Sequence, residues 1–408
     1  MVDQAKDTVG IARLHPISRR HLEALSGDLG IMQHAIGTRP DPAHGYCVDD
    51  VARALEVDLL HARVLGWPSV ADSARRNLRF LEEAFDESTG RFRNFRTVTG
   101  EWVAGKQSDD SQGRAMLAIG ETIGGAPDDE LRDDATRLWD RALPAIGRLT
   151  ALRAQASVVL GCEAILRVGP NEPARTWLAK FARSIDRRLR GNASSDWFWP
   201  EDELTYENAL IPRCLIVAGR RLGSADLVGT GVQVVDWLLS VQTSAGGHLS
   251  PIGNGWWRRG GVRSRFDQQP IEATALLLAA EAALEATGES RFGASMELAY
   301  AWFLGRNDLG RSVANPARGA AFDGLTPSGL NLNQGAESTL MWLIAAEHIR
   351  AHRETAAATA KAAETAAQAT APATTASTTV GPGSRDGAAA GAARDHRPAA
   401  IHLAAAAS

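Results

Sequence analysis

The stretch His44-Gly45-Tyr46-Cys47-Val48-Asp49-Asp50-Val51-Ala52-Arg53-Ala54-Leu55 decides how the fold is interpreted. Two adjacent aspartates stand at the start of a segment that is apolar for most of its length. Acidic side chains at such a position cap free backbone N–H groups and meet the positive end of the helix dipole. One pair therefore indicates only a helix start. A similar arrangement recurs four more times, however, and this recurrence favours a shared site.

Two kinds of predicted helix alternate along the chain. Segments such as 72–85 and 174–189 carry one apolar stripe, whereas segments such as 51–65 and 271–284 are apolar over most of their circumference. Helices of the first kind lie on a surface, and helices of the second kind are buried. About twelve helices therefore predict an all-α (α/α)6 toroid of six helical hairpins, each with one outer and one inner helix. An open solenoid is the alternative, but no fixed-length repeat supports it.

Composition limits the classes of function. The chain has 408 residues and a formal net charge of -4, so no basic field indicates a nucleic-acid partner. Its three cysteines are widely spaced and support neither a disulfide framework nor a zinc site. His44 with Cys47 is a weak metal pair, and we expect no metal and no cofactor.

Both ends of the chain carry further expectations. Residues 1–10 are polar and lack the apolar core of a signal peptide, and no apolar run approaches the ~20 residues of a membrane span. We therefore expect a cytoplasmic protein. Residues 355–408 are rich in alanine and threonine and lack aromatic residues, so we expect a disordered tail after a folded domain that covers 8–354.

The predicted connections differ in length. Inner-to-outer connections are short, whereas the outer-to-inner connections are mostly long: 37–48, 86–109, 191–206, 243–267 and 306–333. Long loops in compact domains are usually functional or disordered, and the Trp, Phe, Asn and Gly content of these loops argues against disorder. In a toroid they all emerge at the end where the inner helices begin. The sequence therefore predicts one common mouth.

Each long loop delivers a polar cluster onto the start of an inner helix. After the opening stretch come 107–114, 197–208, 265–272 and 331–338, whereas the third hairpin, near Thr150, lacks such a cluster. Polar groups on otherwise apolar helices cost free energy unless they are hydrogen-bonded. Tryptophans interleave with these acids, and flat aromatic faces together with carboxylates and amides suit a sugar.

Three of these segments also carry a resemblance. H-G-Y-C-x-D-D-x-A-R-A at 44–54, F-D-Q-Q-P-x-E-A at 266–273 and N-Q-G-A-E-S at 333–338 resemble a group of bacterial proteins in the six-hairpin glycosidase superfamily. Members of this group occur near or fused to glycosyltransferases and mannoside-processing enzymes. The resemblance covers roughly residues 20–350 and implies a carbohydrate-active site, an oligosaccharide or glycan substrate and a functional link to a glycosyltransferase. It carries over no settled catalytic pair.

Glycoside hydrolysis needs paired carboxylates, one to protonate the leaving oxygen and one to activate water or attack the anomeric carbon. The predicted catalytic carboxylates are Asp50, Asp110, Asp267, Glu207 and Glu337. Asp50 and Asp110 are the preferred acid, base or nucleophile candidates, each as the second member of an Asp-Asp pair. The residues predicted to bind substrate or tune these acids are His44, Tyr46, Asp49, Arg53, Trp102, Asp109, Gln112, Arg114, Trp199, Glu201, Tyr206, Asn208, Gln268, Glu272, Asn333 and Gln334.

A glycoside hydrolase is therefore the predicted function, with phosphorolysis less favoured. A sugar epimerase or isomerase on the same toroid is one alternative. That chemistry usually needs histidine bases, and only His44 and His248 lie in the predicted site loops. A terpene-cyclase-like toroid would need an Asp-x-Asp-Asp motif, which the sequence lacks. A non-catalytic sugar-binding protein is distinguished by binding without turnover.

Overall fold

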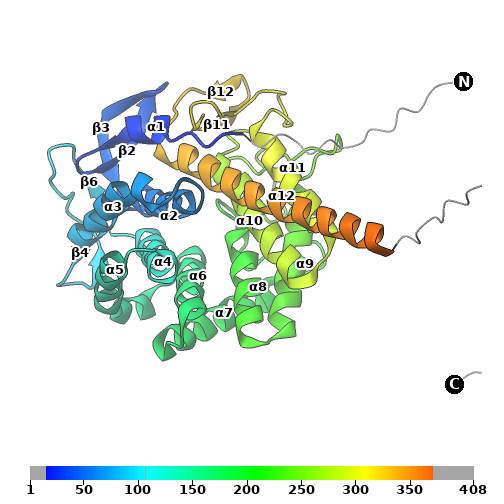
Figure 1. Cartoon of the computed structure of the whole chain (residues 1–408), viewed down its shortest axis with the longest axis horizontal. Helices are drawn as coiled ribbons and strands as arrows, with labels where there is room; N and C mark the ends of the chain where they lie inside the picture. Colours follow the sequence, from blue (N-terminus) through cyan, green and yellow to red (C-terminus); the bar gives the residue numbers. More distant parts are fainter. Residues whose placement is uncertain (1–14, 106, 371–408) are drawn as a thin grey trace, which may run out of the picture. The chain divides into compact units, whose positions relative to one another are not determined.

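The computed structural model describes residues 15–105 and 107–370 and shows an (α/α)6 toroid (Figure 1). The chain divides into two compact units, Met1–Ala358 and Thr359–Ser408, and the toroid belongs to the first. Its helices are α1 (Arg20–Leu25), α2 (Val48–Leu65), α3 (Ala71–Ala84), α4 (Asp109–Gly125), α5 (Asp129–Ala142), α6 (Leu152–Val168), α7 (Glu172–Asn192), α8 (Leu210–Leu222), α9 (Ala225–Gln242), α10 (Pro270–Thr287), α11 (Ser290–Phe303) and α12 (Ala336–Thr370), with short 3-10 helices η1 (Trp67–Ser69) and η2 (Leu143–Arg148).

Outer and inner helices alternate in the predicted order. The outer helix α3 buries Leu78 and Leu81 and exposes Arg75 and Arg79, as an amphipathic surface helix does. The inner helix α10 is buried along nearly all of its circumference. Figure 1 shows the hairpins from α2 to α9 following one another around the ring in sequence order. The predicted fold class is thus confirmed.

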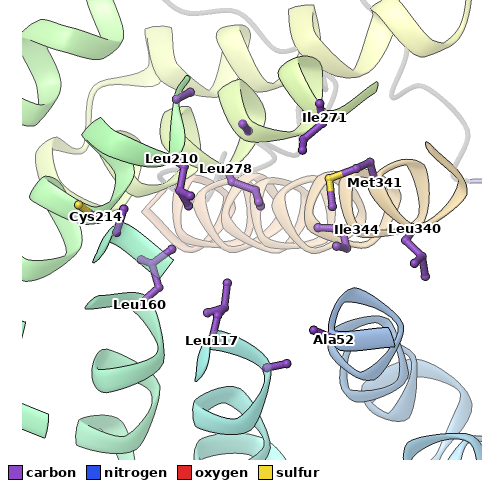
Figure 2. Close-up of a cluster of buried hydrophobic side chains, with 14 of the residues drawn as sticks. Ala52, Leu117, Leu160, Leu210, Cys214, Ile271, Leu278, Leu340, Met341 and Ile344 are labelled. Atoms are coloured by element: carbon purple, nitrogen blue, oxygen red, sulfur yellow. The ribbon is translucent and has the colours of Figure 1, made fainter. Parts of the chain in front are cut away.

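The interior of the ring is lined by apolar side chains. Figure 2 shows buried side chains that point toward a common centre from α2, α4, α6, α8, α10 and α12. They include Ala52, Leu117, Leu160, Leu210, Cys214, Ile271, Leu278, Leu340, Met341 and Ile344. This apolar filling holds the inner helices in place, because the buried area is removed from water on every side of the ring. It also leaves the polar helix starts at one end.

Small residues let α4 and α6 approach closely. A Cβ atom on Gly120 would lie 2.4 Å from the carbonyl oxygen of Gly161, and one on Gly113 would lie 2.6 Å from the Cα of Ala154. No side chain larger than hydrogen fits at these two positions unless the helices move apart. The start of α6 is therefore held against the start of α4.

The first and last inner helices close the ring. Arg53 of α2 forms an ion pair with Glu337 of α12, and the hydroxyl of Thr274 in α10 donates to the carbonyl of Met341 in α12 at 2.9 Å. Helix α12 continues to Thr370, so residues 355–370, which we expected in the disordered tail, are helical. Residues 371–408 of that expected tail lie outside the described part of the chain.

Short strands decorate the loops at the mouth. The connection 37–48, predicted as a loop, is largely a strand that pairs with its neighbours in a sheet of order β1-β2-β3-β6. This correction has a physical reason, because β2 and β3 form an antiparallel hairpin whose pairing satisfies the backbone. The strands are β1 (Ser26–Gly27), β2 (Gly30–Ile36), β3 (Arg39–Cys47), β4 (Phe85–Asp86), β5 (Arg91–Phe92), β6 (Phe95–Arg96), β7 (Glu203–Leu204), β8 (Trp257–Arg258), β9 (Ala314–Asn315), β10 (Ala320–Ala321), β11 (Gly324–Thr326) and β12 (Gly329–Asn331).

The length and the apolar character of a helix together decide whether it could cross a bilayer. Over residues 15–105 and 107–370, no helix combines the length and the apolar character that crossing a bilayer requires.

Candidate functional site

Strand β3 leads directly into α2 and places the first Asp-Asp pair. Cys47, in extended conformation, precedes the helix, and Val48 N donates to the carbonyl of Asn94 at 2.9 Å. Asp50 is buried and accepts from Arg53 Nη1 at 3.2 Å. Burial raises the pKa of Asp50 to about 8, against the opposing effect of the Arg53 charge. Burial thus favours the protonated form of the Asp50 carboxyl.

Arg53 connects Asp50 to a second carboxylate. Its Nη2 lies 3.0 Å from Oε2 of Glu337, whose side chain is 36% exposed. Asp49, beside Asp50, is half-buried, and its Oδ1 is a buried atom without a hydrogen-bond partner among the described residues. Burial raises the pKa of Asp49 as well, while Arg53 and Arg114 lower it. Three carboxyl groups from α2 and α12 therefore surround one guanidinium.

The second Asp-Asp pair, at the start of α4, is used differently. Ser108 caps the helix, with its side chain accepting from Ser111 N. Asp109 Oδ2 accepts from the backbone N–H groups of Thr150 at 2.8 Å and Ala151 at 3.0 Å, and Arg91 donates to its Oδ1 at 2.7 Å. These hydrogen bonds outweigh burial and lower the pKa of Asp109. Asp109 therefore supports the start of α6.

Asp110, the next residue, faces the loop that precedes α8. The hydroxyl of Tyr206 donates to its Oδ2. Glu207 follows Tyr206 in left-handed conformation, with φ of 45°. Such backbone strain in a residue other than glycine persists only where the surroundings enforce it. Here a buried two-point ion pair with Arg114 enforces it.

This ion pair removes Glu207 from the group of free acids. Arg114 Nη1 donates to Glu207 Oε1 at 2.9 Å, and Nη2 contacts Oε2. Burial disfavours the charge of Glu207, but the Arg114 contacts prevail and lower its pKa. A bidentate arginine–carboxylate pair is strong and directional. Arg114 engages both carboxylate oxygens of Glu207. Glu207 therefore supports the site in this geometry and is not available as a proton donor.

Asn208 and Arg153 extend the network to α10 and α6. Asn208 Nδ2 donates to Glu272 Oε2 at 3.0 Å, and burial raises the pKa of Glu272 to about 7. Arg153 Nη2 donates to Asn208 Oδ1 at 3.0 Å, and Nη1 donates to Glu201 at 3.0 Å. The third hairpin, which lacks a polar cluster of the predicted kind, nevertheless supplies Arg153. A charged residue on an otherwise apolar helix was the signal that could have identified it.

Asp267 is separate from this network. It is exposed, with φ of 59°, and its backbone carbonyl accepts from Asn254 N at 3.0 Å. Within the described residues, no contact joins its carboxylate to Asp50, Asp110 or Glu337. The structure thus brings together four of the five predicted catalytic carboxylates.

Several predicted binding residues are buried in structural roles. Tyr46 is 4% exposed and packs against Phe80, with ring centroids 6.2 Å apart. Gln112 accepts from Phe92 N at 3.1 Å, and Trp199 is fully buried with its indole N–H on the carbonyl of Glu203 at 3.1 Å. These side chains pack in the protein interior, and their role in binding substrate stays a prediction.

Gln268 belongs to a second polar cluster around Asp308. Its Nε2 donates to Asp308 Oδ2 at 2.5 Å, and Ser250 Oγ and His248 Nε2 also contact this carboxylate. Burial opposes ionisation of Asp308, but these hydrogen bonds lower its pKa to about 2. The cluster ties the loop 243–267 to the loop after α11. His248 is thus engaged away from Asp50.

Of the other predicted binding residues, Trp102 and His44 lie at the rim, whereas Gln334 is buried. Trp102 is half-buried against Phe80 and under Arg96, whereas Gln334 uses its backbone carbonyl to accept from His21 at 2.8 Å. His44 has 51% of its side chain exposed, with Nε2 3.7 Å from Asp41.

His34 at the rim was missed by the sequence analysis. Its ring lies 4.3 Å from the ring of His44, measured between centroids. Asn333 Oδ1 accepts from Ala35 N at 2.9 Å, so its Nδ2 donates to His34 Nδ1 at 3.0 Å. Burial and the His44 charge lower the pKa of His34. The neutral ring therefore carries its proton on Nε2, as a donor.

The described residues contain no group of three or more His, Cys, Asp and Glu side chains arranged to hold a metal ion. Cys47 is buried beside two aspartates, and burial raises the pKa of its thiol well above the usual value. His44, by contrast, is exposed. The weak pair of His44 and Cys47 is therefore not supported as a ligand set.

Comparison with known proteins identifies the fold. No protein-family model and no curated protein sequence matches the chain. A sugar epimerase from a ruminal bacterium superposes with a TM-score of 0.63 at 12% identity, covering 81% of this chain and 95% of that chain. The cellobiose 2-epimerase from Spirochaeta thermophila superposes with a TM-score of 0.62 at 13% identity, covering 82% and 92%.

A glycoside hydrolase with the same fold is also similar. The GH76A alpha-1,6-mannanase of Salegentibacter sp., in complex with alpha-1,6-mannotetrose, superposes with a TM-score of 0.55 at 11% identity, covering 81% of this chain and 95% of that chain. That structure is an inactive variant in which two consecutive aspartates are replaced by alanine. At these identities the likeness establishes the (α/α)6 fold and leaves the chemistry to the residues.

Proposed function

We propose that this chain is a glycoside hydrolase in which Asp50 is the general acid. The observation that carries the proposal is a buried carboxyl group, with a pKa of about 8, that lies among other carboxylates at the mouth of the ring. A carboxyl group that keeps its proton at neutral pH can protonate a leaving glycosidic oxygen. Arg53 holds this group in position by its hydrogen bond to Oδ1.

The second catalytic carboxyl is assigned to Asp110. It begins the neighbouring inner helix α4, and the Tyr206 hydroxyl orients it by donating to Oδ2. The charge of Asp110 raises the pKa of Asp49, and the charge of Asp49 raises the pKa of Asp50. The three carboxyl groups therefore lie in one region. Asp110 activates water or attacks the anomeric carbon while Asp50 protonates the leaving group.

The similar mannanase supports an alpha-linked mannoside as the first substrate to test. Its activity is lost when two consecutive aspartates are replaced, and it binds alpha-1,6-mannotetrose. Two of this chain's four such pairs, Asp49-Asp50 and Asp109-Asp110, lie at the starts of adjacent inner helices. The hydrogen-bonding capacity around them, from carboxylates and guanidinium groups, suits sugar hydroxyls.

The test is hydrolysis in H₂¹⁸O. Alpha-1,6-manno-oligosaccharides and beta-1,4-cello-oligosaccharides of two to four units are incubated with the purified chain, and products are identified by mass spectrometry. A hydrolase releases shorter sugars with ¹⁸O at a new reducing end. We expect Asp50→Asn and Asp110→Asn each to lower kcat/KM by about 10³-fold, the range of one acid–base group.

Asp72→Asn is the matched control, because Asp72 begins the outer helix α3 and its side chain is fully exposed. It should retain activity. Turnover that survives in both Asp50→Asn and Asp110→Asn would contradict the assignment of these carboxyls.

A sugar epimerase is the second candidate, and the observation that favours it is the exposed imidazole of His44 beside Asp41. An imidazole can abstract a proton next to a carbonyl. His34 does not serve as that base through Nε2, because the Asn333 contact places the proton there. Epimerisation leaves the substrate mass unchanged in H₂O, and in D₂O its product carries deuterium. Such a product, without chain shortening, would replace the hydrolase proposal with this one.

A further inference from the structure

A pocket lies beside the mouth and outside the cluster of catalytic carboxyls. It is open to solvent, has a volume of about 410 Å³, and is lined by Gln33, His44, Gly45, Phe95, Arg96 and Val98, among others. This volume falls in the range of about 300–1,000 Å³ that small-molecule sites occupy. The pocket is thus large enough for a ligand of sugar size.

Residues that line the pocket are close in the chain to residues of the mouth. His44 and Gly45 belong to β3, which leads into the helix that carries Asp50. On the other side, the His44 ring contacts the His34 ring, and His34 is held by Asn333, shortly before Glu337. A ligand in the pocket therefore lies next to residues that lead to both Asp50 and Glu337.

The backbone of the pocket requires glycine at one position. Gly45 has φ of 64°, and a Cβ atom there would lie 2.2 Å from the carbonyl oxygen of Arg96. A larger residue would force β3 and β6 apart, and this pairing brings Tyr46 opposite Arg96. The wall of the pocket is therefore fixed by a close backbone contact.

The lining combines aromatic, apolar and hydrogen-bonding groups. Phe95 is half-buried, and Val98 is 40% exposed. Gln33 Nε2 is a buried donor without a partner among the residues that the structure describes, and His44 has half of its side chain exposed. Apolar faces with a few hydrogen-bonding groups match a sugar ring with its C–H faces and hydroxyls.

The charges of the pocket favour a neutral sugar. Arg96 Nη1 is paired with Glu83 at 2.5 Å, and Nε donates to the carbonyl of Gly100 at 2.9 Å. The guanidinium also lies 5.1 Å from the ring centroid of Trp102. Arg96 is therefore committed to other partners, and Asp41 lies close to His44. An acidic sugar or a phosphate would find little compensation for its charge.

We propose that this pocket is a subsite for a second, neutral sugar unit of the substrate, adjacent to the unit that reacts at the mouth. The inference rests on the proposed function and deepens it, because it makes the substrate an oligosaccharide of at least two neutral units. Affinity should then increase with chain length until the pocket is filled.

The test measures binding to the full chain with Asp50→Asn, so that sugars are not consumed. Isothermal titration with neutral alpha-1,6-manno- and beta-1,4-cello-oligosaccharides of one to four units gives Kd against length. We expect one added unit to tighten binding about tenfold in the series that fits, which corresponds to about 1.4 kcal/mol. Val98→Trp fills the pocket from an exposed position and should abolish this gain.

Val168→Trp is the matched control, because Val168 is 62% exposed and lies at the opposite end of α6 from the mouth. It should keep the length dependence. A gain that persists in Val98→Trp, or equal affinity at all lengths, would overturn the subsite and leave the hydrolase proposal intact. Tighter binding of oligogalacturonides than of neutral sugars would overturn the neutral assignment. Failure of every oligosaccharide to bind would overturn the proposed function as well.

Discussion

The Asp-Asp pairs at the starts of the inner helices α2 and α4 share a sequence pattern but differ in their hydrogen-bond partners and in the direction of their pKa shifts. At the start of α4, Ser108 caps the helix, and Asp109 bonds to the backbone of the next inner helix. At the start of α2, Cys47 supplies no capping bond in the described structure, and Asp50 is buried against a single arginine. The pKa of Asp109 is lowered, whereas that of Asp50 is raised to about 8.

This difference shows that the role of an acidic pair at a helix start depends on the groups that hydrogen-bond to its carboxylates. Backbone N–H donors stabilise a carboxylate as an anion, whereas burial with few donors leaves it protonated. One pattern therefore yields, in Asp109 of α4, a carboxylate stabilised as an anion and, in Asp50 of α2, a carboxyl group whose protonated form is favoured. Four predictions test this contrast.

The largest expected effect is on catalysis. Asp50→Asn should lower kcat/KM by about 10³-fold, because the general acid is lost. Asp109→Asn should lower it far less, because Asp109 acts on the backbone of the start of α6. The measurement is steady-state kinetics on the best oligosaccharide. Equal losses in the two variants would remove the contrast between the pairs.

The second effect is on the pH dependence of stability. Because the pKa of Asp50 is raised in the folded chain, its protonated form contributes stability that is complete below the unfolded pKa near 3.8 and is lost as the pH rises through about 8. One pKa unit corresponds to about 1.4 kcal/mol.

The free energy of unfolding of the wild type should therefore fall relative to that of Asp50→Asn by several kcal/mol between pH 4 and pH 8. Urea titrations across this range measure the difference. Parallel curves would show that Asp50 titrates normally. Asp109 has the opposite sign: its lowered pKa adds stability above the unfolded value, and this stability is lost as the pH falls through the folded value.

The third effect compares the first member of each pair. Asp109→Ala should destabilise the chain by about 2–3 kcal/mol, because it leaves the N–H groups of Thr150 and Ala151 and the Arg91 cation without their acceptor. Asp49→Ala should cost less than about 1 kcal/mol, since Asp49 Oδ1 has no partner among the described residues. Urea unfolding at pH 7 measures both. A reversed order would contradict the structural roles.

The smallest effect concerns the cap of α4. Ser108→Ala removes the side-chain acceptor for Ser111 N and should cost about 1 kcal/mol. Ser290→Ala, at the exposed first residue of the outer helix α11, provides a serine control. Thermal unfolding followed by circular dichroism measures the shift, and an unchanged midpoint for Ser108→Ala would contradict the capping role.

The sequence predicted the fold better than the roles of individual polar residues. Alternation of apolar and amphipathic helices depends on local periodicity, so the ring of hairpins could be recognised without coordinates. The partners of polar residues depend on contacts between distant segments. Gln268 was predicted to bind substrate, but its side chain donates a hydrogen bond to Asp308. Trp199, also predicted to bind substrate, is fully buried in the core.

Long-range pairing also explains what was missed. Arg153 joins the network through Glu201 and Asn208, which follow it by a whole outer helix, and His34 depends on Asn333 near the other end of the fold. The sequence on either side of Arg153 and His34 does not indicate which distant residues they contact. The acids at helix starts could be found from sequence, whereas the division between supporting and reactive acids could not.

The Arg53–Glu337 contact has a consequence for redesigning the chain. The same guanidinium that joins the first inner helix to the last also holds the carboxyl group of Asp50. In a circular permutant whose termini are moved to the short turn around η1, α2 and α12 would belong to one continuous segment. The Arg53–Glu337 contact would then form within that segment. Swapping the final hairpin for that of a relative, by contrast, would alter the surroundings of Asp50 even if every residue of α2 were kept.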